Sequence, residues 1–208
     1  MKYPNAFKGV KKLFTAQLLS LLGTVTLIVT AIVALCTVST SQGETSFAAA
    51  ALGLAAIFVV ISCIAFILKL AGLSAGGKDE PLFKTALFFA VAGIVINGLD
   101  FFLSSELAKN IGSILIPVTE VLLIYYVICA IRSLAEKLGD SEMAKRAKGV
   151  ITIVFVTFGV GLLAQILGRF VFTGTLDDAL KIVGYALEIV QFVVYLSYLA
   201  RAKKTLAQ

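Results

Sequence analysis

The sequence predicts an all-α protein: a polytopic membrane bundle of six transmembrane helices, forming a single integral-membrane domain over residues 1–208. Two observations predict it, namely six long apolar segments joined by short loops and a concentration of basic residues in every second loop. A hydrocarbon core of ~30 Å needs about twenty apolar residues at ~1.5 Å per residue, and each segment supplies them. The predicted helices cover residues 13–37, 47–73, 83–104, 111–133, 150–173 and 180–200.

The composition argues against a soluble fold. Hydrophobic residues make up 60% of the chain and charged residues 14%. A soluble helical domain would interrupt its apolar runs with a polar face at helical spacing, because one side of each helix would meet water. Such faces are missing from these segments, which excludes soluble enzymes and soluble binding domains.

The basic residues predict the orientation. Fifteen of the 18 lysines and arginines fall in the two tails, in the second and fourth loops, or at the adjoining helix ends. Because basic loops stay on the cytoplasmic side during insertion, we expect both termini to be cytoplasmic, in a plasma membrane of bacterial type. The loops at 38–46, 105–110 and 174–179 are then outside. The net charge of +6 fits this topology and attraction to anionic lipid, with no nucleic-acid partner.

The segments also align as pairs. Thr15 and Thr85 are each followed by alanine and, eight residues after the threonine, by glycine. The second, fourth and sixth segments each have a basic residue close to their end, at Lys69, Arg132 and Arg201. This predicts three repeated helical hairpins, although any apolar hairpins with basic inner ends would align in the same way. The length, six crossings and cytoplasmic termini are similar to the substrate-binding subunits of energy-coupling-factor vitamin importers, and the similarity covers topology only.

No catalytic motif is recognisable. The chain has no histidine, and its three cysteines, Cys36, Cys63 and Cys129, stand singly in apolar stretches. This excludes the Ser-His and Cys-His arrangements of hydrolases, histidine-ligated metals and Cys-x-x-C pairs. We therefore expect neither an enzyme nor a cofactor or metal site.

Polar residues inside the apolar segments are the best indication of function. Each ionisable group at that depth costs about 2–3 kcal/mol, so these side chains should face one another or a wet cavity. Pairs three or four residues apart share a helix face, and Glu120 follows Pro117, which is expected to loosen its helix. The candidate substrate-binding residues are Asn97, Asp100, Glu120, Gln165, Arg169, Glu188 and Gln191.

Two functions follow from this cluster. The first is binding or transport of a small polar or cationic solute, either alone or together with other membrane subunits. The alternative is a non-transporting membrane protein that binds a protein partner or lipid, in which Arg169 pairs with Asp100 or Glu188 and the amides link helices. Both interpretations place the protein in contact with the lipid bilayer.

Small residues predict where helices approach closely. They occur at helical spacing as Ala86, Ala90 and Gly93, as Ala16, Ser20 and Gly23, and as Ala49, Gly53 and Ala56. The segment 5–12 is expected either to lie along the inner membrane surface, with Tyr3, Phe7, Val10 and Phe14 toward lipid, or to extend the first helix.

Overall fold

The computed structural model describes residues 2–38, 44–102, 106–170 and 175–207, without the side chains at some of the helix ends beside the gaps. These residues form six helices and confirm the all-α class. The helices are α1 (Pro4–Val38), α2 (Glu44–Gly76), α3 (Leu82–Phe102), α4 (Glu106–Leu138), α5 (Ser141–Phe170) and α6 (Thr175–Thr205).

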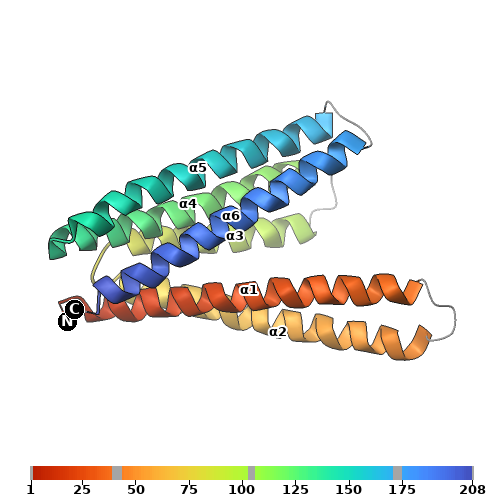
Figure 1. Ribbon diagram of the computed structural model, residues 1–208, viewed down its shortest axis with the longest axis horizontal. Coiled ribbons are helices and arrows are strands. Elements are labelled where there is room, and N and C mark those ends of the chain that lie inside the picture. The colour runs from red at the N-terminus through yellow and green to blue at the C-terminus, as the bar shows by residue number, and fades with distance from the viewer. Residues whose placement is uncertain (1, 39–43, 103–105, 171–174, 208) are drawn as a thin grey trace.

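The helices form three hairpins (Figure 1), and the contacts between neighbouring hairpins follow a ring order. Within the hairpins α1 packs on α2, α3 on α4, and α5 on α6. Contacts of α2 with α3, α4 with α5, and α6 with α1 complete the ring. The expected hairpin pairing is therefore observed, whereas the descent of the three hairpins from one repeat stays a prediction.

Five of the helices are long and apolar enough to cross a membrane. Their qualifying stretches are Pro4–Thr30, Leu52–Gly76, Leu82–Leu99, Ile114–Leu138 and Ser141–Ala164. In the described part of the chain α6 does not reach this level of apolarity, so the sixth crossing stays a prediction. Large apolar side chains cover the outside of the bundle; Leu52, for example, is 72% exposed and Phe88 67%. Such a surface fits a multi-pass membrane protein.

The core lies at one end of the bundle. Both termini lie there, together with the turns between α2 and α3 and between α4 and α5, and we call it the closed end (Figure 1). Fully buried side chains of five helices meet there: Val10, Leu73, Phe83, Leu134 and Leu199. Toward the opposite end, the open end, the α1–α2 hairpin separates from the other four helices (Figure 1). Beyond Ala16 the larger side chains of α1 become increasingly exposed, because this separation leaves α2 as the main neighbour of α1.

At the closed end the helices continue beyond the predicted apolar segments. Residues 5–12 extend α1 rather than lying on a membrane surface. Ala6 and Val10 are buried, and Tyr3, Phe7 and Phe14 pack against the core rather than facing lipid. The lysines of this stretch, Lys8, Lys11 and Lys12, stay exposed, so the extension is amphipathic and packs by one face.

The expected loop between the fourth and fifth segments is nearly absent. Only Gly139 and Asp140 separate α4 from α5. Gly139 has a φ of 78°. The amide of Asp140 donates to the carbonyl of Ala135 at 2.9 Å, and that of Gly139 to Glu136 at 3.1 Å. These bonds end α4 in a Schellman motif, where glycine adopts the left-handed conformation without steric cost.

Acidic side chains fasten the turns of the closed end. Asp79 accepts hydrogen bonds from the side chain of Asn5 at 2.9 Å and from the amide of Ala6 at 2.8 Å, which satisfies a free donor in the first turn of α1. Glu80 is buried and accepts from Ser133 Oγ at 3.0 Å and from Lys137 Nζ at 2.5 Å. The α2–α3 turn is thus tied to both α1 and α4.

Small residues bring α1 and α2 together, but not where we expected on α2. Gly53 and Ala56 are exposed, and a Cβ built on Gly53 would contact nothing within 4 Å. The close approach is instead between Gly9 and Gly72, where a Cβ on Gly9 would lie 2.6 Å from the Gly72 carbonyl oxygen. On α3 the expected face is observed, since Ala86 and Ala90 are buried and Gly93 faces Thr119.

Replacing Gly9 with alanine is expected to destabilise the protein by about 1–3 kcal/mol, because the backbones of α1 and α2 must move apart to admit a methyl group. Gly53→Ala is the matched control, since the same methyl group meets open space there. Thermal unfolding of both variants in detergent measures the difference. Equal melting temperatures would show that the Gly9–Gly72 approach is unimportant for stability.

Candidate functional site

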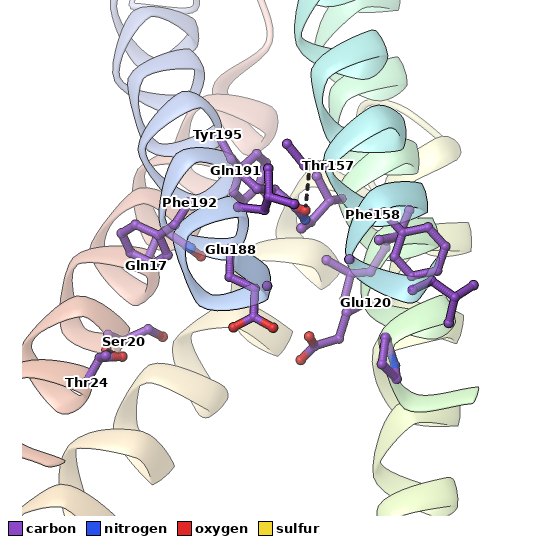
Figure 2. Close-up of a pocket in the computed structure, with 18 of the residues that line it drawn as sticks. Gln17, Ser20, Thr24, Glu120, Thr157, Phe158, Glu188, Gln191, Phe192 and Tyr195 are labelled. Carbon is purple, nitrogen blue, oxygen red and sulfur yellow. Dashed lines mark hydrogen bonds between the residues drawn. The ribbon is translucent and has the colours of Figure 1, made fainter. Parts of the chain in front are cut away.

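A cleft of about 430 Å³ lies about half-way along the helices, where the α1–α2 hairpin begins to separate from α4, α5 and α6 (Figure 2). Side chains of α1, α2, α4, α5 and α6 line it. The volume is in the range of about 300–1,000 Å³ that is typical of small-molecule sites. The cleft therefore results from the bundle's geometry: helices packed at the closed end and splayed beyond it.

Glu120 reaches the cleft from α4. It follows Pro117, which lies inside the helix and also lines the cleft. Proline lacks an amide hydrogen and cannot make the usual bond to the carbonyl four residues earlier, so the helix backbone is locally less regular. The helix nevertheless continues, and the Thr119 hydroxyl donates to the Ile116 carbonyl at 2.8 Å. Glu120 itself is exposed to the cleft.

Glu188 and Gln191 reach the cleft from the same face of α6. The Thr157 hydroxyl lies 3.1 Å from Gln191 Oε1, a contact between α5 and α6, and 2.8 Å from the Ile153 carbonyl of its own helix. Glu188 is exposed, and its carboxyl group and that of Glu120 extend from opposite sides into one space (Figure 2). None of the basic side chains that the structure describes forms a salt bridge with either carboxylate.

A polar face of α1, which was not among the predicted site residues, forms the wall of the cleft opposite α4 and α5 (Figure 2). Gln17, Ser20 and Thr24 line the cleft at spacings of three and four residues (Figure 2). The Ser20 and Thr24 hydroxyls donate to the carbonyls of Ala16 and Ser20, both at 3.1 Å. Each hydroxyl has one hydrogen, so these oxygens offer only lone pairs to the cleft. From the sequence, Ser20 is expected on a packing face of small residues. The helical spacing of Gln17, Ser20 and Thr24 is the feature that could have indicated a polar face instead.

Lys69 and three aromatic residues complete the lining. Lys69, the basic residue near the end of the second predicted segment, lines the cleft from α2. Phe158, Phe192 and Tyr195 are also part of the wall, and Tyr195 is buried. The site thus combines two carboxylates, one ammonium group, several hydroxyl and amide groups, and an apolar surface.

The seven candidate residues have different outcomes. Glu120, Glu188 and Gln191 meet in the cleft. Asn97 lies in a neighbouring cavity and donates to the Gly93 carbonyl of its own helix at 2.8 Å, so it does not link helices. The side chains of Asp100, Gln165 and Arg169 lie outside the described residues. The expected pairing of Arg169 with Asp100 or Glu188 therefore stays a prediction.

The described residues contain no group of three or more histidine, cysteine, aspartate or glutamate side chains placed to hold a metal ion. Cys63 and Cys129 are single free thiols. The cleft lining itself offers charged and hydrogen-bonding side chains.

Fold and cleft together define the class: a helical bundle of multi-pass membrane type with a polar cleft between its hairpins. No protein-family model, curated protein or solved structure matches this chain. The functional argument consequently depends on the cleft itself.

Proposed function

We propose that this protein binds a small organic cation in the central cleft, as a binding or transport protein of the plasma membrane. The observation that carries the proposal is the pair Glu120 and Glu188, two exposed carboxylates on different helices that extend into one cleft (Figure 2). Two carboxylates against Lys69 leave a net negative site, which attracts cations.

The other groups in the cleft favour an organic cation. The hydroxyls of Ser20 and Thr24 donate to their own helix, so their lone pairs are left for the N–H donors of an ammonium group. Phe158, Phe192 and Tyr195 line the cleft and contribute apolar surface for the hydrocarbon part of such a cation. A bare Ca²⁺ ion takes about six to eight oxygen ligands, of which the two carboxylates supply at most four.

Transport is the favoured form of this function. In this proposal α6 is the sixth crossing, because its 31 residues run beside α5 over a similar length (Figure 1). Solute would reach the carboxylates from the open end while the packed core blocks the closed end. Movement of the α1–α2 hairpin against the other helices would then reverse this access, either alone or with further membrane subunits.

The alternative, a membrane protein that binds a protein partner or lipid, is favoured by α2. Only 6% of its most apolar stretch is buried, which leaves a long apolar face for another molecule. The two functions differ in whether a cation binds in the cleft.

Binding of a small organic cation distinguishes the two proposed functions. n-Butylammonium at about 100 times its Kd would stabilise the protein by roughly 2.7 kcal/mol, which raises the melting temperature by several degrees. Butanol at the same concentration is the control, since it has a similar hydrocarbon chain without the charge. No difference between the two compounds would contradict cation binding and favour the partner-binding alternative.

The proposed orientation places the closed end in the cytoplasm, because the basic residues concentrate there. In a cysteine-free background, we expect a membrane-impermeant thiol reagent to label Ser41→Cys and not Ser141→Cys when it is added outside. Ser41 lies outside the described residues, between α1 and α2, and Ser141 begins α5 at the closed end. The opposite labelling pattern would invert the orientation.

A further inference from the structure

A second cavity of about 360 Å³ lies beside the cleft, between α2, α3 and α4. Apolar side chains form much of its wall, among them Phe66, Phe89 and Ile94. Lys69, Glu120 and Leu123 line both this side cavity and the cleft. A ligand held by Glu120 is therefore in immediate contact with an apolar space.

Exposed apolar side chains on the outside of the bundle border the side cavity. Ile94, part of its wall, is 43% exposed, and the neighbouring Val91 and Val95 on α3 are 45% and 55% exposed. These residues lie within the membrane-spanning stretch Leu82–Leu99. The cavity thus faces the hydrocarbon region, from which an apolar chain could enter it.

We infer that the bound cation is amphipathic: an alkylammonium ion with its charged head at Glu120 and Glu188 and its hydrocarbon chain in the side cavity. This rests on the proposed function and names its substrate class. Lys69 stands at the boundary and repels a second positive charge, so the ammonium group stays on the Glu188 side while the chain passes Leu123. Burying the chain contributes to affinity because apolar surface leaves water.

The test is the dependence of affinity on chain length. n-Alkylammonium ions from propyl to octyl are titrated against the full-length protein in nanodiscs of zwitterionic phosphatidylcholine. We expect affinity to rise by about fourfold for each methylene that enters the cavity. Partition into the bilayer is measured with the Glu120→Gln, Glu188→Gln double variant in the same nanodiscs and subtracted.

Ile94→Trp narrows the side cavity from its exposed rim, so the gain in affinity between propyl and octyl chains should shrink to less than a tenth of the parent's gain. Val91→Trp is the matched control on the same helix, since Val91 is equally exposed but does not line either cavity. An unchanged gain in Ile94→Trp, or equal losses in both variants, would overturn the inference.

A failure of the inference is distinguishable from a failure of the proposed function. If propylammonium and octylammonium bind equally well to the parent, cation binding is supported, but the side cavity does not hold the hydrocarbon chain. If no alkylammonium ion binds, both the proposed function and the assignment of the side cavity to a hydrocarbon chain fail.

Discussion

Glu188→Gln is expected to weaken binding of n-butylammonium by roughly 10- to 100-fold, the value of a hydrogen bond to a charged group. Glutamine keeps the shape of the side chain and one acceptor oxygen but removes the negative charge. Since Glu188 is exposed to the cleft and has no described salt-bridge partner, its replacement should leave the fold intact. Isothermal titration on folded protein measures the change.

Glu142→Gln is the control for this prediction. Glu142 is also an exposed glutamate, but it lies at the closed end and pairs with Arg146 on the same helix, away from the cleft. We expect its affinity for the cation to equal that of the parent. Glu120→Gln should resemble Glu188→Gln, because both carboxylates face the same space (Figure 2). Undiminished binding in both cleft variants would exclude the carboxylate pair as the site.

The largest expected effect on stability is that of Glu80→Ala, which should destabilise the protein by about 2–3 kcal/mol. The Glu80 side chain is 7% exposed and joins the α2–α3 turn to Lys137 and Ser133 of α4. Its removal leaves two donors without their acceptor and a small void at the closed end. The Lys137 side chain is 48% exposed, so water can solvate its ammonium group once Glu80 is removed. The loss of stability is therefore smaller than for a fully buried ion pair.

Glu136→Ala is the matched control, since Glu136 lies on α4 directly beside Lys137, the ion-pair partner of Glu80. Its partner Arg132 lies four residues away on the same helix, and the pair is largely in solvent, with side-chain exposures of 36% and 52%. Such pairs contribute about 0.5 kcal/mol or less. Denaturant unfolding of both variants should separate them clearly. A loss in Glu80→Ala no greater than in Glu136→Ala would mean that the turn does not hold the closed end together.

The helices were predictable from the sequence, but their ends at the closed end were not. An apolar window stops at the first cluster of lysines, as at Lys11 and Lys12, although the helix continues. The continuation is stabilised by packing of Ala6 and Val10 against distant segments. Packing against distant segments also continues α4 and α5 into the expected loop after the fourth segment, which is therefore reduced to a two-residue turn.

The candidate site was partly predictable for a different reason. A carboxylate in an apolar run is costly in a membrane, so Glu120 and Glu188 were conspicuous. Ser20 and Thr24 were not, because a hydroxyl that bonds to its own helix backbone is tolerated at any position in an apolar helix. Lys69 was ambiguous, since a long side chain near a helix end has more than one direction available.

The sequence by itself therefore determined the class of the protein and the costly groups it carries, because both depend on the free energy of transfer between water and hydrocarbon, which is a property of local composition. Only the tertiary structure decided which groups meet. The packing of Gly9 on Gly72, the separation of the α1–α2 hairpin, and the cavity beside Glu120 arise from contacts between segments far apart in the chain. Those contacts depend on the shapes of both partners, which no single segment specifies.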